Sequence, residues 1–229
     1  MDHRPLEQQV DKKLWPVALW LWLLWIVVAG VGVWAYPRLP SDVPVHFSAT
    51  GRVNGVMTKG LVVTVMPAII GALLFVWSVL WRLDPRRPNY VLFWKTYRFV
   101  GALGALLLCV VQLWIIARAL NFPVPGVRLW PFCGGLLLLL LSNVLPRVEP
   151  NWWLGIRTPW TLSDLRVWRQ THWLAGRVGV LFALVMLIVA TFGPLWLTSW
   201  VVVGLAMLWA VFAYVMSYYY YRRLHFAPR

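Results

Sequence analysis

The sequence predicts an all-α integral membrane protein, a six-helix transmembrane bundle with an extracytoplasmic loop lid and a cytoplasmic interfacial amphipathic helix. Of its 229 residues, 61% are hydrophobic and 12% are charged, whereas soluble domains are nearer half apolar and a quarter charged. The apolar residues gather in six runs of membrane-spanning length, about 20 residues each. Each run is expected to be helical, because a spanning segment must satisfy its own backbone hydrogen bonds in lipid.

The six runs are taken in order from the N-terminus. The first is expected to be a retained span, because it is longer than a signal-peptide core and lacks a small-residue cleavage site at its end. Pro131 falls in the first turn of the fourth span, where proline is tolerated. Gly193-Pro194 separates the last two, which predicts a tight helical hairpin. The expected spans are Leu14–Tyr36, Leu61–Trp81, Phe99–Ala117, Leu129–Leu145, Val178–Phe192 and Leu197–Tyr220.

The basic residues predict the orientation. With the N-terminus inside, the inner segments hold sixteen of the 21 Lys and Arg residues and the outer segments hold five. Basic residues favour the cytoplasmic side of a membrane, so both termini are expected in the cytoplasm. The net charge of +14 is attributed to orientation and to contact with anionic lipid headgroups. No direct nucleic-acid binding is expected.

The chemistry-bearing residues indicate no enzyme. Cys109 and Cys133 lie inside apolar runs, so neither a disulfide framework nor a metal site is expected. The sequence shows no phosphate-binding loop, metal-ligand set or nucleophile–base spacing. No cofactor, metal or catalytic residue is therefore predicted.

The outer segment, residues 37–60, is rich in turn-forming residues and is expected to form a compact lid. Val43-Pro-Val-His-Phe47 suits a short extended piece, because a residue before proline avoids the helical region. Thr50-Gly51 and Asn54-Gly55 predict turns. His46 with Asp42 could form a metal or proton-linked pair, although two ligands are too few for a metal site. The favoured interpretation is a histidine hydrogen-bonded within the folded loop, and Lys59 is interpreted as an interfacial anchor.

The inner segment, residues 149–177, is expected to fold into an interfacial helix that leads into the fifth span. Trp152 and Trp153 suit the membrane interface. Thr161 is the expected N-cap, and Asp164 three residues later gives a near capping box. A basic face and an apolar face follow at helical spacing.

Lipid contact alone does not explain several polar residues near this segment. Ser142 and Asn143 are expected to face the bundle interior. His172 is expected to find a partner in Asn151, Glu149 or Asn143, and it is either a packed, hydrogen-bonded histidine or a proton carrier. Arg157 is either a headgroup anchor or a grip on phosphate or carboxylate. Together these side chains could outline a polar pocket.

A short internal echo links two inner loops. Pro88-Asn89-Tyr90 follows the second span, and Pro150-Asn151-Trp152 follows the fourth. Three residues are too few to indicate a duplication.

The inner segment closely resembles the signature of the SdpI family of bacterial membrane proteins. The resemblance rests on Asn151-Trp-Trp-Leu-Gly-Ile-Arg-Thr-Pro-Trp-Thr-Leu-Ser-Asp164, followed by Trp168, Thr171-His172 and Gly176. The outer loop resembles a module of unknown function that often precedes it, marked by L-P-x-x-V-P-x-H-F-x-x-x-G and a later lysine between Leu39 and Lys59. This implies an N-terminal module at 1–82, with two spans and the outer loop 37–60, and an SdpI-like four-span module at 83–229.

The resemblance implies a protein of the bacterial inner membrane that is not an enzyme. It would give immunity to a secreted toxic peptide, or sense the peptide and signal to a cytoplasmic repressor. The implied inner site is Asn151, Gly155, Arg157, Thr158, Pro159, Trp160, Asp164, Trp168 and His172. The implied outer site is Asp42, Pro44, His46, Phe47, Gly51 and Lys59. Two alternatives stay open. One is a transporter or enzyme that handles a lipid-linked or small anionic substrate at the cytoplasmic face, and the other is a scaffold whose loops only set topology.

Overall fold

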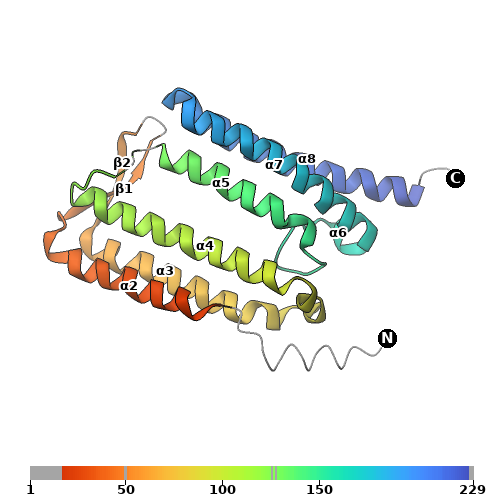
Figure 1. Cartoon of the computed structure of the whole chain (residues 1–229), viewed down its shortest axis with the longest axis horizontal. Coiled ribbons are helices and arrows are strands. Elements are labelled where there is room, and N and C mark those ends of the chain that lie inside the picture. Colours follow the sequence, from red (N-terminus) through yellow and green to blue (C-terminus); the bar gives the residue numbers. More distant parts are fainter. Residues whose placement is uncertain (1–16, 49–50, 125, 127, 227–229) are drawn as a thin grey trace. The chain divides into compact units, whose positions relative to one another are not determined.

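The computed structural model describes residues 17–48, 51–124, 126 and 128–226, and it is predominantly helical (Figure 1). Within that part of the chain, six helices are long and apolar enough to cross a membrane, which confirms the predicted all-α membrane bundle. The six helices are α2 (Leu19–Ala35), α3 (Lys59–Leu80), α4 (Tyr90–Ala119), α5 (Leu129–Val144), α7 (Leu165–Phe192) and α8 (Leu195–Phe226).

The described residues form two compact units. The first, called the hairpin unit, comprises residues 17–79 and 98–130. The second, called the motif unit, comprises residues 80–97 and 131–226. The division of the sequence into modules 1–82 and 83–229 stays a prediction.

In the hairpin unit, small residues let large side chains of neighbouring helices come close. Gly71 of α3 lies against the indole of Trp25, where an added Cβ would be 3.0 Å from the ring. The Trp25 Nε1 donates to the carbonyl oxygen of Pro67 at 2.7 Å. Both contacts hold α2 against α3, and the core between these helices and α4 includes Val28 and Ile70, which are fully buried.

The outer segment forms a two-stranded antiparallel hairpin of β1 (Asp42–Phe47) and β2 (Val53–Thr58). The predicted extended piece is therefore confirmed. The predicted turn at Asn54-Gly55 is wrong, because both residues lie inside β2 with Gly55 opposite His46. Close strand contact explains the glycine, since an added Cβ would stand 2.9 Å from the His46 Cβ. Thr50, in the other predicted turn, lies outside the described residues.

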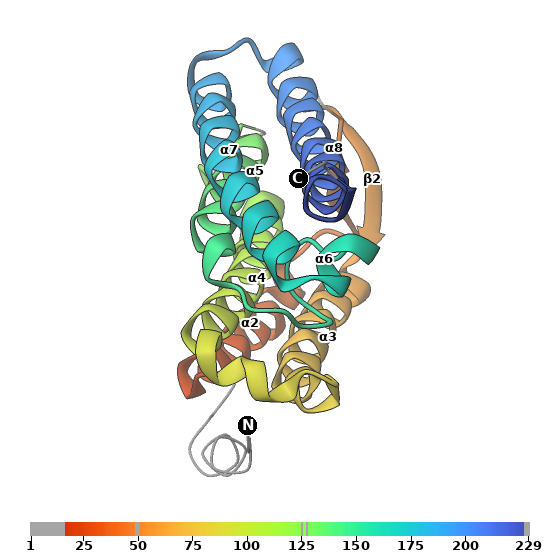
Figure 2. The same cartoon turned by 90° about the vertical axis from the view of Figure 1, so that its right-hand side faces the viewer.

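In the motif unit, α5, α7 and α8 pack together, and the short helix α6 (Pro159–Ser163) contacts α7 and α8 (Figure 2). Gly176 and Gly179 of α7 lie against α5, where added Cβ atoms would be 2.8 Å from the Ser142 carbonyl oxygen and 2.2 Å from the Ser142 Oγ. The Trp209 Nε1 of α8 donates to the Ala175 carbonyl oxygen at 2.8 Å. These close approaches fix the helices that carry the inner segment.

The interfacial helix predicted from Thr161 to Arg177 is not a separate element. Thr158, rather than Thr161, is the N-cap of α6, because Pro159 sits at the first helical position, which suits proline. Asp164 is extended and starts a new helix, α7, which continues without interruption to Phe192. Residues 165–177 are therefore the first turns of the fifth span.

One other helix start differs from prediction, and another lies outside the described residues. The expected start of the first span at Leu14 lies outside the described residues. The third helix, α4, begins at Tyr90 instead of Phe99, with a non-helical backbone at Phe93. Aromatic packing explains the added turns, because Tyr90 and Tyr97 are fully buried with their rings 5.1 Å apart.

Candidate functional site

The inner segment, residues 149–177, is here called the motif segment. Asn151 stabilises the loop at its start. Its side chain is fully buried. Its Oδ1 accepts from the backbone N–H groups of Trp153 at 2.8 Å and Leu154 at 2.6 Å. Its Nδ2 donates to the carbonyl oxygens of Glu149 and Leu154, both at 2.9 Å. An amide side chain has two acceptor sites and two donors, so Asn151 is saturated by backbone contacts.

His172 is also saturated by the backbone, and none of its predicted partners contacts it. Its Nε2 accepts from the N–H of Ile156 at 3.0 Å, and its Nδ1 donates to the Trp168 carbonyl oxygen at 2.9 Å. The prediction of Asn151, Glu149 or Asn143 as partner is wrong, because these two backbone groups fill both ring nitrogens. An acceptor at Nε2 and a donor at Nδ1 define a neutral imidazole. The structure therefore bears out a packed, hydrogen-bonded histidine.

Gly155 and Trp168 hold the imidazole in place. Gly155 has φ +108°, and a Cβ added there would stand 2.5 Å from the His172 Nε2. The Trp168 ring stacks on the imidazole with centroids 4.0 Å apart, and its Nε1 donates to the Val148 carbonyl oxygen at 2.7 Å. Glycine is required here for two reasons, a left-handed backbone and the close imidazole.

Two consecutive helix caps order the centre of the motif segment. The Thr158 Oγ1 accepts from the N–H of Thr161 at 3.2 Å, and the Thr161 Oγ1 accepts in return from the N–H of Thr158 at 2.9 Å. The Asp164 carboxylate accepts from the N–H of Arg166 at 2.7 Å, which caps α7. Thr158 and Thr161 are buried, so the first cap replaces water for these backbone groups.

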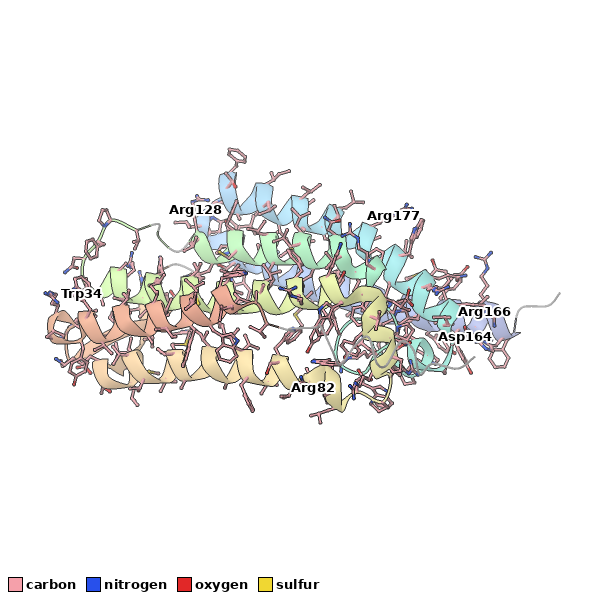
Figure 3. All side chains as sticks on the ribbon, turned by 60° about the horizontal axis from the view of Figure 1, so that its bottom comes forward. Trp34, Arg82, Arg128, Asp164, Arg166 and Arg177 are labelled. Carbon is pink, nitrogen blue, oxygen red and sulfur yellow. The ribbon has the colours of Figure 1, made fainter. Side chains whose placement is uncertain are left out.

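Asp164 contacts two basic side chains at the start of α7, where Figure 3 shows it beside Arg166. The Arg166 guanidinium lies 3.0 Å from its carboxylate, and the His225 Nε2 of α8 lies 3.4 Å away. The hydrogen bond from the Arg166 side chain holds the pKa of the Asp164 carboxyl below its usual range. A carboxylate at a helix N-terminus is also favoured by the helix dipole.

Trp160 and Arg157 lie nearer the surface. The Trp160 ring packs against Tyr214 and Tyr218 of α8, with centroids 5.2 and 4.9 Å apart. Arg157 is exposed, and its guanidinium donates to the Trp152 carbonyl oxygen. Arg157 is thus an exposed signature residue that uses one guanidinium nitrogen on the backbone.

Sequence reasoning missed Asp84, which joins the loop after α3 to the motif segment. The side chain is 4% exposed. Its carboxylate accepts from the N–H of Arg86 at 2.7 Å, the Tyr90 hydroxyl at 2.7 Å and the N–H of Trp152 at 2.8 Å. The Asn89 Nδ2 adds a bond to the Pro150 carbonyl oxygen at 2.7 Å. The sequence echo at residues 88–90 and 150–152 was the available signal, because these two segments are in contact.

A pocket of about 460 Å³ opens where these two loops meet α6 and α7. At its lining, the Arg86 guanidinium donates to the Leu162 carbonyl oxygen at 2.7 Å, and Arg169 lies 3.7 Å from the Glu149 carboxylate. The lining residues are Arg86, Asn89, Leu92, Glu149, Pro150, Thr161, Leu162, Ser163, Leu165 and Arg169.

The polar pocket predicted from the sequence has a different lining. Asn143, Asn151, Arg157 and His172 do not line the pocket described above. Asn143 is exposed, contrary to the expectation that it faces the bundle interior, whereas Ser142 is buried as expected. The prediction failed because adjacent helical residues point in directions about 100° apart, and only Ser142 is turned towards α7.

In the hairpin unit, the predicted outer residues divide between the two ends of the hairpin. The His46 Nδ1 pairs with the Asn54 Oδ1 at 2.5 Å, which confirms a histidine hydrogen-bonded within the loop. Asp42 stands opposite Thr58 at the other end of the strands, so the less favoured alternative, an Asp42–His46 pair, does not form. In the described part of the chain, no three His, Cys, Asp or Glu side chains group as metal ligands.

The other four predicted outer residues, Phe47, Lys59, Pro44 and Gly51, take part in packing and in the hairpin itself. The Phe47 ring packs edge-on against Trp114 of α4, with centroids 5.2 Å apart. The Lys59 ammonium lies 4.9 Å from the centre of the Tyr36 ring, in a cation–π contact. Pro44 pairs with Val56 across the strands, and Gly51 has φ +84°. Phe47 and Lys59 thus tie the hairpin to α4 and to the segment after α2.

Two regions of the chain match known protein families. Residues 147–217 match the SdpI/YfhL protein family, and residues 23–71 match a domain of unknown function, DUF1648. The chain is 24% identical over 190 residues to a protein named Immunity protein SdpI from Bacillus subtilis (strain 168), covering 83% of this chain and 88% of that protein. No solved structure matches.

Proposed function

We propose that this chain, a member of the SdpI/YfhL family through residues 147–217, is a membrane protein that gives its cell immunity to a toxic peptide. The similarity to Immunity protein SdpI carries the proposal, because it extends over 83% of this chain and 88% of that protein. The match therefore includes the outer hairpin as well as the motif segment. A non-enzymatic role agrees with side chains at the motif segment that are engaged by the backbone.

The finer proposal is that the two segments act on opposite sides of the membrane. The hairpin follows one candidate span and the motif segment follows four, so they would lie on opposite faces if each helix crosses the membrane once, which supports the proposal. The excess of Lys and Arg beside the motif segment favours the cytoplasm for it and the outside for the hairpin. The hairpin would then meet the toxic peptide, and the motif segment would meet a cytoplasmic partner such as a repressor.

Signalling between the two faces requires a peptide that binds one helix arrangement more tightly than another. Arg157 and Arg169 would offer the cytoplasmic partner exposed guanidinium groups. Trp152 and Trp153 are 46% and 41% exposed beside them. Exposed aromatic and arginine side chains are enriched at partner interfaces, which supports the motif segment as the partner-binding end.

Complementation tests the immunity proposal. The chain, its His46→Ala variant and its Arg157→Ala variant are expressed in Bacillus subtilis cells deleted for their own immunity protein, with an empty vector as control. The cells are challenged with medium from the immune parent, and membrane abundance is measured by blot. Wild type is expected to restore survival, and a variant that fails at equal abundance locates the active face. Killing equal to the empty vector at full abundance contradicts the proposal.

The pocket at the motif segment favours one second candidate, a carrier or enzyme for a small anionic substrate. Arg86 and Arg169 could hold a carboxylate or phosphate there. Uptake of anions into proteoliposomes distinguishes the candidates. Flux that requires Arg169 would favour transport, whereas protection of cells without flux favours immunity.

A further inference from the structure

Basic and aromatic side chains line a second groove, on another part of the motif unit. It has a volume of about 510 Å³ and lies between the first turns of α7 and the last turns of α8. Its lining residues are Arg169, Gln170, Trp173, Tyr220, Arg223 and Leu224. The two helices pack along their lengths, so the groove is a fixed feature of one unit.

Positive charge around this groove exceeds the negative charge that contacts it. Five arginines lie on these turns, namely Arg166, Arg169, Arg177, Arg222 and Arg223. In the described part of the chain, the carboxylates within 4 Å of them belong to Asp164, which holds Arg166, and Glu149, which lies 3.7 Å from Arg169. Arg223 is exposed at the groove with no ion pair among the described residues. The surplus favours an anion.

The aromatic and apolar side chains indicate where that anion comes from. Trp173 is 48% exposed, and indole and phenol rings are enriched at the membrane interface. Along α7 the same face continues at helical spacing through Leu181 and Leu184, which are 62% and 45% exposed. The two arginines that line the groove therefore lie beside an exposed apolar face of α7, as the headgroup and acyl chains of a lipid require. An acidic soluble protein would not need the apolar part.

We propose that this groove binds the phosphate of an anionic phospholipid. Arg169 and Arg223 donate charge-assisted hydrogen bonds to the phosphate oxygens, Trp173 and Tyr220 lie at headgroup level, and the acyl chains follow α7. A basic pocket between membrane helices is a recognised way to hold anionic headgroups. The groove shares Arg169 with the pocket beside Arg86, but lipid binding in it does not depend on the proposed immunity function.

Lipid binding is measured by native mass spectrometry of the full chain in detergent, with phosphatidylglycerol as the probe and phosphatidylcholine as the zwitterionic comparison. The test variant is Arg223→Gln. The matched control is Arg222→Gln, which removes the same charge from an exposed neighbour that does not line the groove. Wild type and Arg222→Gln are expected to retain phosphatidylglycerol over phosphatidylcholine. Arg223→Gln is expected to weaken that binding by about tenfold, because one charge-assisted contact is lost.

Three outcomes overturn the proposal. Equal loss in both variants shows diffuse attraction without a site, and equal retention shows that Arg223 does not hold the headgroup. Displacement of phosphatidylglycerol by low-millimolar inorganic phosphate, or by an acidic peptide, assigns the groove to a free anion or a protein partner. Thermal melting of each variant in detergent verifies that the comparison is made between folded proteins.

Discussion

At the scale of single residues, the signature side chains act mainly on backbone groups. Asn151 and His172 each use their full hydrogen-bonding capacity on nearby N–H and C=O groups. Removing the hydrogen-bond partner of a buried polar group lowers the free energy of unfolding. The density of the signature therefore reflects the need to fold an irregular loop, and substitutions there are expected to lower protein stability.

Gly155→Ala is expected to destabilise the protein by about 2 kcal/mol or more, because it combines a left-handed backbone with a clash at the imidazole. At this chain length that corresponds to a fall in Tm of about 5 °C or more. Thermal melting in detergent by size-exclusion chromatography measures it. Gly30→Ala is the matched control, because no atom lies within 4 Å of the added Cβ. Equal Tm values for the two variants would refute the role of Gly155.

Asp84→Ala is expected to lower the free energy of unfolding by about 2–5 kcal/mol, since it leaves the Tyr90 hydroxyl and the N–H of Trp152 without their buried acceptor. Asp42→Ala, at an exposed strand position, is expected to stay within about 0.5 kcal/mol of wild type. Limited proteolysis within residues 149–158, together with Tm, reports the loss. A motif segment that remains protected in Asp84→Ala would show that Asp84 does not anchor it.

The sequence predicted some of these residue contacts and could not predict others. The packed state of His172 followed from an imidazole on an apolar helical face, but its partners are backbone groups 16 and 4 residues away. Backbone groups look alike in every sequence, so side-chain chemistry pointed to Asn151 instead. Asp84 was missed because a lone acid in a loop carries no pattern until Tyr90 and Trp152 are brought to it.

At the scale of elements, two caps in series decide where helices begin. Thr161 followed by Asp164 resembles a capping box, yet Thr158 and Pro159 precede it and start α6 first. Asp164 then caps α7. Sequence reasoning found the helical periodicity of residues 165–177 correctly, but not its continuity with the fifth span, because a basic face and an apolar span differ in composition although they share one helix.

Asp164→Ala is expected to cost about 1 kcal/mol through loss of the α7 cap, whereas Asp164→Asn keeps a capping oxygen. The pKa of Asp164 is lowered in the folded protein, so its charge-dependent stabilisation is present above the unfolded pKa of about 3.9 and is lost as pH falls through the lower folded pKa. The Tm difference between wild type and Asp164→Asn should therefore shrink as the pH is lowered from 7 to below about 4. A difference that grows on acidification would contradict the assigned sign.

At the scale of the whole molecule, function depends on which segments share a side of the membrane. An even number of spans predicts N- and C-termini on one side, and composition alone was sufficient to predict the six spans. The units into which the helices pack depend on long-range contacts such as Asp84 to Trp152, which hydropathy does not report. The orientation rests on the charge bias of sixteen to five, which makes a topology prediction that labelling can decide.

Single cysteines test that topology in a background with Cys109→Ala and Cys133→Ala. Val56→Cys, on β2, is expected to react with a membrane-impermeant maleimide on intact cells, because Val56 is 59% exposed and follows one span. Ser163→Cys, exposed in α6, should react only after the cells are permeabilised. Labelling of Ser163→Cys on intact cells would show that the protein has the opposite orientation in the membrane. The hairpin would then face the cytoplasm, and a secreted peptide could not reach it from outside, so the division of roles between the two segments depends on this result.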